Sequence, residues 1–510
     1  MTNDARDTRL SWALHEALGN ETPPDLVERT VARFAAGDGV RVPQPVERRQ
    51  PRRWSVALAS LLAAAVVAAF ALWPRQDPSP GDASAQEPQK EPSVAVRSRS
   101  DIDALPATCT AVVGTSLDDD AVRALARLRN LQHLELRYPE TLVRGLGLKT
   151  PPPDDPPCIT GAAFATLSQF AQLRTLRILG AHAMTESFPA DATDHEHEAI
   201  AERTLDHLSR LPVLRELALS HFDVPAYALA VLPRLSALRT LDLSANYGVD
   251  AEAIEQIVRC HSLHSLSLQS CMAIPGSAIA RLAVLPNLQD LDVGNIDGMD
   301  WRSGGGDFLG PATHHYQALA HAAFARGDCG VTDLALRALS TSTTLRTLLM
   351  PQPHCTQNGM QSLRDFAALE RLDVFGFGGA PSAIDELADW LPPLLELSLC
   401  GDFGDTFCKK LRDGQPRLRH LEIPACYEIT DRGLADLLGI ASLRHLNISQ
   451  SRGLTKEALP LLLAAVQLEY LDVSHIDWVT QEHLAALQRS LPNLRTLRDS
   501  VEDEDGLRGR

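Results

Sequence analysis

The sequence predicts an α/β solenoid of stacked repeats, with parallel strands on its concave face and helices on its convex face, preceded by one transmembrane helix. Three observations support this fold class: a leucine triplet that recurs along residues 106–498, a helix-start pattern that follows each triplet, and an uncharged apolar run over residues 54–73. Such units cannot bury their apolar faces alone, because each comprises only about 25 residues, so they are stable only when they stack.

The leucine triplet has the form Leu-x-x-Leu-x-Leu, in which the later positions also admit Ile, Val or Met. Nine of the twelve steps between successive first leucines are 24–26 residues long, a regularity that chance does not produce. Because strand side chains alternate between two faces, each triplet predicts one short strand with its leucines buried. The first leucines are Leu131, Leu173, Leu214, Leu238, Leu263, Leu288, Leu345, Leu369, Leu394, Leu418, Leu443, Leu468 and Leu494.

A second pattern predicts a helix after each strand. An aliphatic residue, a helix-capping residue, two variable positions, a small residue and another aliphatic residue follow one another, as in 249–254 and 429–434. Asp250 and Thr430 stand at the capping position of these two segments. Their side-chain oxygens are suited to accept the unpaired N–H groups of the first helical turn.

Cysteine and asparagine positions narrow the type of repeat. Cys271 and Cys426 stand three residues after the last apolar strand position, where Asn246 stands in its own repeat, and Cys260 stands three residues before Leu263. We expect the side chain in the turn after the strand to bond the backbone of the neighbouring coil. With these motifs the chain resembles the leucine-rich repeat family over about residues 106–498, and loosely its cysteine-containing subtype known from F-box substrate receptors. The resemblance implies a horseshoe-shaped solenoid, and the sequence contains no F-box-like module.

Residues 54–73 contain twenty residues without a charge, which as a helix would cross a hydrocarbon core of about 30 Å. Trp54 and Trp73 stand at its two ends, where amphipathic rings favour the membrane interface, and the arginine cluster in residues 48–53 is expected to stay cytoplasmic. We therefore predict an uncleaved single-pass anchor with the N-terminus cytoplasmic and the C-terminal domain outside. A buried helix and a cleaved signal peptide are the alternatives.

The remaining boundaries follow from composition. Residues 1–53 are predicted to form a short cytoplasmic helical segment, residues 74–105 a disordered linker and residues 499–510 an acidic tail. The layout resembles membrane-anchored anti-sigma factors, although no cysteine precedes Cys109 to supply the His/Cys zinc motif that many of them carry. Arginine outnumbers lysine 43 to 5, which indicates a GC-rich bacterial genome and hence a bacterial inner membrane with the solenoid facing the periplasm.

Three steps between triplets exceed a 25-residue unit, by 17, 16 and 32 residues, which places insertions near 138–158, 180–199 and 294–330. In each, the helix-start pattern resumes fourteen residues before the next triplet, so the added residues lie between strand and helix. All three are therefore expected at one rim. Insertions on one face often mark a binding surface, neutral drift being the alternative. The stretch His195-Glu196-His197 lacks the second histidine of HExxH, so no metal site is predicted there.

A column of charge is predicted on the concave face between the strand leucines. Since parallel strands lie about 4.8 Å apart, carboxylates on alternate strands would be about 10 Å apart, close to one Debye length, so repulsion is relieved while a negative stripe remains. A basic or polycationic partner surface is the functional interpretation. The alternative is that aspartate is simply common at this position in the family. The predicted partner-binding residues are Glu135, Asp242, Asp292, Asp373, Glu422 and Asp472.

The net charge of −17 argues against a nucleic-acid partner. The sequence has no recognisable nucleophile motif, so we expect no catalytic residues, no metal and no cofactor, and predict that the protein is not an enzyme. The leading interpretation is a membrane-anchored protein that binds another protein or macromolecule through the concave face and the insertion-bearing rim. The alternative is a transmembrane signalling regulator whose residues 1–53 hold a partner. Candidate disulfides are Cys400–Cys408 and Cys329–Cys355.

Overall fold

The computed structural model describes residues 93–138, 159, 161–180, 205–220, 224, 226–246, 248–271, 274–294, 330–350, 354–375, 385–401 and 403–499. The predicted segments 1–53 and 54–73, the acidic tail beyond residue 499 and the interiors of the three insertions lie outside these residues. Within the described ranges no helix is both long and apolar enough to cross a membrane. Residues Pro74–Arg510 form a compact unit of their own, separate from Met1–Trp73.

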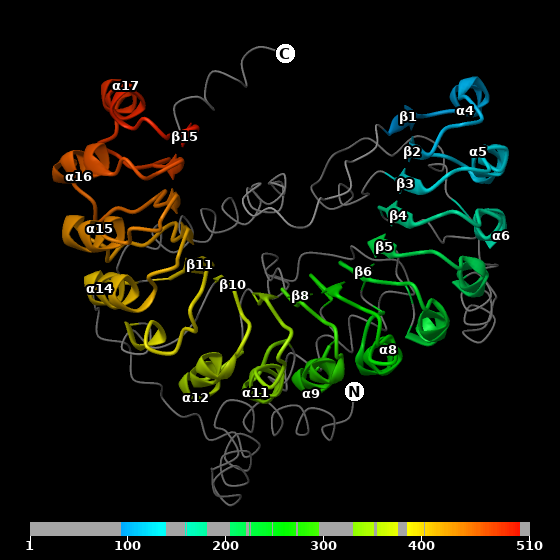
Figure 1. The fold of residues 1–510 in the computed structure, drawn as a ribbon, viewed down its shortest axis with the longest axis horizontal. Helices are drawn as coiled ribbons and strands as arrows, with labels where there is room; N and C mark the ends of the chain where they lie inside the picture. Colours follow the sequence, from blue (N-terminus) through cyan, green and yellow to red (C-terminus); the bar gives the residue numbers. More distant parts are fainter. Residues whose placement is uncertain are drawn as a thin grey trace, which may run out of the picture. The chain divides into compact units, whose positions relative to one another are not determined.

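In the described part of the chain, fifteen parallel strands form one sheet in which the spatial order follows the chain order. Figure 1 shows the strands along the inner side of an arc and the helices along its outer side, which is an α/β solenoid. Each of the thirteen predicted leucine triplets coincides with one strand, from β3 to β15. The strands are β1 (Val94–Val96), β2 (Ala111–Thr115), β3 (His133–Arg137), β4 (Thr175–Leu179), β5 (Glu216–Ser220), β6 (Thr240–Asp242), β7 (Ser265–Ser267), β8 (Asp290–Asp292), β9 (Thr347–Leu349), β10 (Arg371–Phe375), β11 (Glu396–Cys400), β12 (His420–Glu422), β13 (His445–Asn447), β14 (Tyr470–Asp472) and β15 (Thr496–Arg498).

The convex elements are short α-helices and 3₁₀ turns. Among the described residues, the connection between β5 and β6 contains only the tighter 3₁₀ form where a helix was predicted, and the other 3₁₀ turns adjoin α-helical residues. The α-helices are α4 (Arg99–Ala104), α5 (Asp119–Leu125), α6 (Gly161–Leu167), α8 (Ala251–Ile257), α9 (Gly276–Arg281), α11 (Asp333–Leu339), α12 (Gln357–Met360), α14 (Asp405–Gly414), α15 (Asp431–Leu438), α16 (Leu459–Ala464) and α17 (Gln481–Ser490). The 3₁₀ elements are η2 (His207–Arg210), η3 (Ala226–Arg234), η4 (Leu282–Val284), η6 (Gln361–Asp365) and η7 (Lys456–Ala458).

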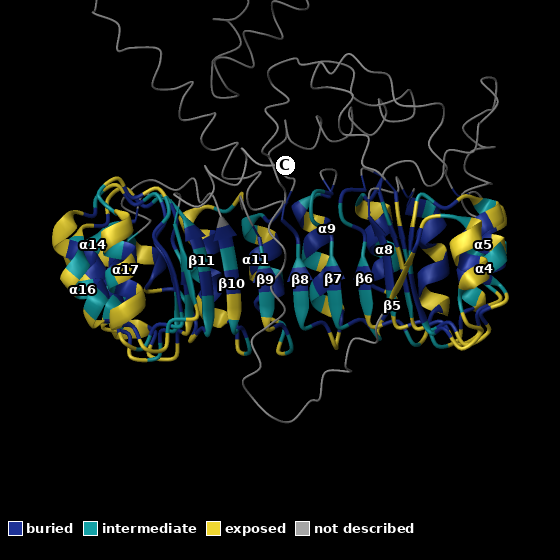
Figure 2. Ribbon diagram, turned by 90° about the horizontal axis from the view of Figure 1, so that it is seen from above, coloured by how far each residue is buried: buried dark blue, intermediate teal, exposed yellow. Residues whose placement is uncertain are grey.

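One continuous apolar core runs between the strand layer and the helix layer (Figure 2). In the unit of β12, Leu418, Leu421 and Ile423 are all 0% exposed, as the triplet predicts. Burying each such side chain contributes about 1.5–3 kcal/mol relative to leaving it in water. Each repeat covers the apolar face of its neighbour, so the core is self-contained within residues Pro74–Arg510. These residues can therefore be treated as an independently folding domain.

In the repeats of β6, β7 and β12 the turn after the strand bonds the preceding coil, as predicted. The Asn246 amide donates to the backbone carbonyl of Leu219 at 2.6 Å, and in the same position of another repeat the Cys426 thiol donates to the carbonyl of Gly401 at 3.2 Å. Both side chains are 0% exposed. This contact satisfies backbone groups that would otherwise be buried without a hydrogen bond.

The helix starts are linked from one repeat to the next. Thr430 Oγ1 accepts the N–H of Arg432, which confirms the predicted cap. The same residue also donates from its hydroxyl and backbone N–H to the Asp405 carboxylate of the preceding helix, at 2.6 and 2.9 Å. Thr455 repeats both bonds to Asp431, at the same two distances. The Thr-Asp pair therefore caps its own helix and ties it to a neighbour.

The sheet begins before the predicted boundary at residue 106. β1 pairs with β2, and α4 follows it with a capping box between Ser98 and Asp101, so residues 94–104 belong to the solenoid rather than to a linker. Leucine triplets are absent here because smaller residues fill the strand core. Gly114 occupies an apolar position of β2, where a Cβ would overlap the Leu117 side chain.

The described cysteines are thiols, so the candidate Cys400–Cys408 disulfide is not formed. Cys408 is 0% exposed and belongs to the apolar core under α14. Cys355 is likewise a thiol and donates to the Val331 carbonyl at 3.2 Å, while Cys329, its predicted partner, lies outside the described residues. Burial raises the pKa of the Cys271 thiol to about 12, which makes it unreactive at neutral pH.

Candidate interaction surface

The register of the sheet places the six predicted carboxylates in one column. The middle concave position runs through Glu135 on β3, Asp242 on β6, Asp292 on β8, Asp373 on β10, Glu422 on β12 and Asp472 on β14, each strand paired with its neighbours at this position. Alternation along each strand was enough to predict this column. The six carboxylates have different surroundings, and these surroundings determine which of them are accessible to a binding partner.

Two members form ion pairs within the face. Glu135 lies 2.5 Å from Arg137 and 4.0 Å from Arg177. Glu422 lies 3.4 Å from the ring of His445, which is an ion pair when the histidine is protonated. Local positive charge therefore reduces the field that these two carboxylates present to a partner.

Asp472 is a correction to the prediction, because it is only 4% exposed, and Asn447 beside it is only 2% exposed. Its carboxylate accepts the backbone N–H of Ser474 at 2.9 Å. The neighbouring Tyr470 is itself 6% exposed, and its ring stacks on that of His445. Asp472 therefore caps the end of β14 and is too buried to contact a binding partner.

The centre of the face is acidic and rich in hydroxyl groups. On β6, β7 and β8 the two concave positions of each strand together carry three aspartates, one threonine and two serines, and no lysine, arginine or histidine. All six side chains are half-buried. We call this set the central acidic patch: Thr240, Asp242, Ser265, Ser267, Asp290 and Asp292.

Hydrogen bonds hold the patch in place. Asp242 Oδ1 accepts the backbone N–H of Ser244 at 2.9 Å, and Asp292 Oδ1 accepts that of Gly294 at 3.1 Å, so each aspartate caps the end of its own strand. The Ser244 hydroxyl lies 2.9 Å from that of Ser267, which donates to Asp292 at 3.4 Å. The two carboxylates are thus oriented by a shared network across three strands.

Asp373 lies at the margin of this patch. It is half-buried on β10, two strands from Asp292. The first concave position of the same strand is Arg371, which lies 3.4 Å from Glu396 on β11. From β8 toward the C-terminus, Arg371 on β10 is therefore the first basic side chain on the concave face. The section without basic side chains ends before β10.

The three long connections leave from one rim, as predicted. They begin after β3, β4 and β8 and end before α6, η2 and α11. Because all strands are parallel, these departures share the edge at the strands' C-terminal ends. The longest connection leaves two residues beyond Asp292, directly beside the central acidic patch.

An aromatic ladder lies further along the concave face. The ring centroids of His420 and His445 are 5.1 Å apart, and those of His445 and Tyr470 are 3.8 Å apart with nearly parallel planes. Desolvation lowers the pKa of His420 below its usual value, and nearby His445 and Arg371 act in the same direction, while Glu396 and Glu422 oppose them.

The unfolded chain therefore binds a proton at this histidine more readily than the folded protein does. We expect stability to fall as pH drops through about 6.5, the unfolded value, and to level off below the folded pKa of His420. The loss has a limiting slope of one proton, about 1.4 kcal/mol per pH unit. Urea unfolding from pH 8 to pH 5 measures it. His420→Gln should remove this part of the slope, and an unchanged slope would contradict the assignment.

The sequence interpretation missed a row of arginines at the opposite edge. In seven of the thirteen triplets the residue directly after the first leucine is arginine, and this position precedes the strand. The repeated Leu-Arg pair was the available signal. We call this set the arginine rim: Arg174, Arg215, Arg239, Arg346, Arg419, Arg444 and Arg495.

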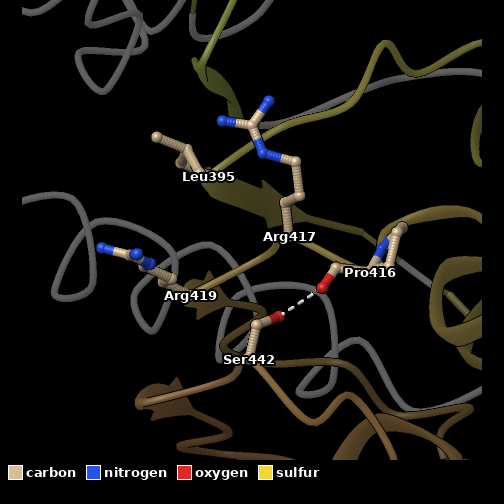
Figure 3. A pocket seen from close by; sticks show the side chains of 5 residues that line it. All are labelled: Leu395, Pro416, Arg417, Arg419 and Ser442. Atoms are coloured by element: carbon tan, nitrogen blue, oxygen red, sulfur yellow. Dashed lines mark hydrogen bonds between the residues drawn. The ribbon is translucent and has the colours of Figure 1, made fainter.

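A small pocket lies on the same edge, where the connections to β11, β12 and β13 meet. It is lined by Leu395, Pro416, Arg417, Arg419 and Ser442, and Figure 3 shows the two guanidinium groups extending away from the Ser442–Pro416 hydrogen bond. That bond, 2.9 Å from the serine hydroxyl to the proline carbonyl, ties two successive connections together. The pocket is therefore an indentation of the arginine-bearing edge.

Comparisons with known proteins identify no family for this chain. No family model and no curated protein matches the sequence. Among solved structures, a chain of the Rad7 and Elc1 complex in yeast aligns over 94% of this chain and 93% of its own, at 15% identity and a TM-score of 0.43. An internalin (inlF) from Listeria monocytogenes str. 4b F2365 aligns over 73% and 82%, at 15% identity and a TM-score of 0.34.

The chain's own repeats define its class. Thirteen leucine triplets on thirteen parallel strands, backed by helices and a continuous leucine core, make it an α/β solenoid that resembles leucine-rich repeat folds.

Proposed function

We propose that this protein is a binding module whose central acidic patch receives a basic surface of another protein or macromolecule. The supporting observation is that three successive strands present three aspartates and three hydroxyl groups with no basic side chain among them. Complementary charge of this kind steers association and selects partners more than it adds raw affinity. The long connection that leaves beside the patch is the segment best placed to add contacts to the same partner.

The proposal includes a membrane tether and no catalytic role. Residues 54–73 would anchor the chain with residues 1–53 in the cytoplasm and the solenoid on the other side, in a bacterial inner membrane facing the periplasm. The supporting features are the uncharged run, its flanking tryptophans and the arginines before it. Protease treatment of sealed, right-side-out membranes should degrade the solenoid and spare residues 1–53. If purified residues 1–53 specifically captured a cytoplasmic protein, the signalling regulator would be favoured instead.

Neutralising the patch should weaken binding to a basic partner. The variant carries Asp242→Asn, Asp290→Asn and Asp292→Asn. An asparagine keeps the oxygen that caps the strand end, as Asn447 does for the N–H of Ser449 at 2.9 Å, so the fold should persist. We expect a loss of roughly tenfold in affinity for oligolysine at low salt, from charge pairs worth about 0.5 kcal/mol each. Isothermal titration of residues 74–510 measures it.

A control with the same net charge separates the patch from general acidity. Asp120→Asn, Glu252→Gln and Glu482→Gln remove three exposed carboxylates from convex helices. This control should bind oligolysine as the unaltered solenoid does. Equal weakening in both triple variants would mean that binding follows overall charge, and the patch would lose its assignment.

A further inference from the structure

The helix-to-strand edge is strongly basic in an acidic protein. A helix-to-strand connection here means the residues between the end of a helix and the start of the next strand. The thirteen such connections that lead into β3–β15 carry eleven arginines, no lysine and three carboxylates, which gives a net charge of +8. The whole chain has a net charge of −17. Positive charge is therefore concentrated at the edge opposite the long connections, whereas the central acidic patch on the concave face carries negative charge.

The arginine rim gives this edge a regular geometry. Arg174, Arg215 and Arg239 precede three successive strands, β4, β5 and β6, and all three are exposed. Strand spacing in a parallel sheet is about 4.8 Å, so neighbouring arginines stand close enough to act on one anionic surface. The seven members of the rim are distributed along the sheet from β4 to β15.

Most of this charge is not neutralised within the described part of the chain. Arg346 and Arg495 each lie 3.5 Å from a glutamate of a neighbouring connection, and more than half of each arginine side chain is exposed. Arg239 and Arg444 donate to backbone carbonyls, at 3.2 Å and at 2.8–2.9 Å, which orient the guanidinium groups but leave their charge in place.

We propose that the arginine rim docks the solenoid on the phosphate headgroups of an anionic lipid bilayer. A row spread along an arc is reached all at once only by a broad, flat partner, whereas a peptide strand or helix would meet a few members. Arginine presents paired N–H donors that suit phosphate oxygens. The proposed membrane tether would allow the rim to contact the same bilayer. The roughly twenty residues between position 73 and β1 can span at most about 70 Å.

Docking by the rim does not depend on the concave patch, and a vesicle assay with residues 74–510 tests it without the tether. The protein should cosediment with phosphatidylcholine vesicles containing about one third phosphatidylglycerol, less so as salt is raised, and not with phosphatidylcholine alone. The variant Arg174→Gln, Arg215→Gln and Arg239→Gln should lose roughly 100-fold in partition coefficient, about fivefold for each arginine.

The matched control removes three exposed arginines from convex helices by Arg123→Gln, Arg337→Gln and Arg432→Gln. It should retain vesicle binding, and circular dichroism should show that both variants are folded. Equal loss in the two variants, or equal binding to vesicles with and without phosphatidylglycerol, would overturn the proposal. Binding of the rim to polyglutamate but not to anionic vesicles would also overturn it, and would assign this edge to an acidic protein.

Discussion

Replacing Asn246 with alanine is expected to lower the free energy of unfolding by about 3 kcal/mol, from two buried backbone groups left without a partner at about 1–3 kcal/mol each. The side chain is 0% exposed, and its amide donates to the carbonyls of Leu219 and Leu243 at 2.6 and 2.8 Å. Its oxygen accepts the N–H of Val224 at 3.2 Å. Truncation therefore removes three buried hydrogen bonds, two of which join neighbouring coils. The Leu243 carbonyl keeps the Cys271 thiol as a donor, so the Leu219 carbonyl and the Val224 N–H are the two groups left without a partner. Urea unfolding of residues 74–510 measures the loss.

Cysteine at this position provides the matched control. Cys271 and Cys426 occupy the same place in their own repeats, and each thiol donates to a carbonyl of the preceding coil, at 3.1 and 3.2 Å. Asn246→Cys should therefore cost about half as much as Asn246→Ala, because one of the bonds is replaced by a weaker one. If cysteine and alanine were equally damaging, the turn would not be held by this contact.

The second large effect is expected at the link between α14 and α15. Asp405 accepts three hydrogen bonds, two from Thr430 and one from the N–H of Gly433 at 3.0 Å. A Cβ on Gly433 would overlap the Asp405 carboxylate. We expect Asp405→Ala and Gly433→Ala each to cost about 2 kcal/mol of unfolding free energy, even though alanine is the better helix former by about 1 kcal/mol.

The two changes should not be additive. Once the carboxylate is removed by Asp405→Ala, the added methyl group of Gly433→Ala has no oxygen to displace, so its cost should fall to near zero or become a small gain. A double-mutant cycle by urea unfolding gives the coupling. If Gly433→Ala cost the same in both backgrounds, steric conflict with Asp405 would not be the reason for glycine there.

The sequence predicts the repetitive part of this fold well, because leucine positions and strand alternation are local patterns. Leu418, Leu421 and Ile423 were expected in the core and are fully buried. β1 and β2 were missed because valine and glycine fill their apolar positions. The Ser98–Asp101 capping box, visible in the sequence, would have indicated a helix in the supposed linker.

The register of the carboxylate column was predicted correctly, and its role as a binding site stays a prediction. The environments of its members were predicted less well. The register of the column follows from alternation, but the burial of Asp472 depends on its surroundings, which no repeat pattern encodes. Asp290 was omitted because it occupies the first concave position rather than the middle one, and only the paired strands show the two columns side by side. The arginine rim was visible in the sequence as a repeated Leu-Arg pair. Only the parallel sheet shows that these arginines lie along one edge.

The most direct test of the proposed function is to locate the partner on the solenoid in cells. A photoreactive side chain placed at Ser267, in the middle of the central acidic patch, is compared with one placed at Glu252 on α8, on the opposite side of the core. Ser267 should crosslink to a lysine- or arginine-rich segment of a partner, and the Asp→Asn triple variant should abolish that product. Crosslinks that form from Glu252 and not from Ser267 would place the partner on the helices and contradict a binding role for the concave face.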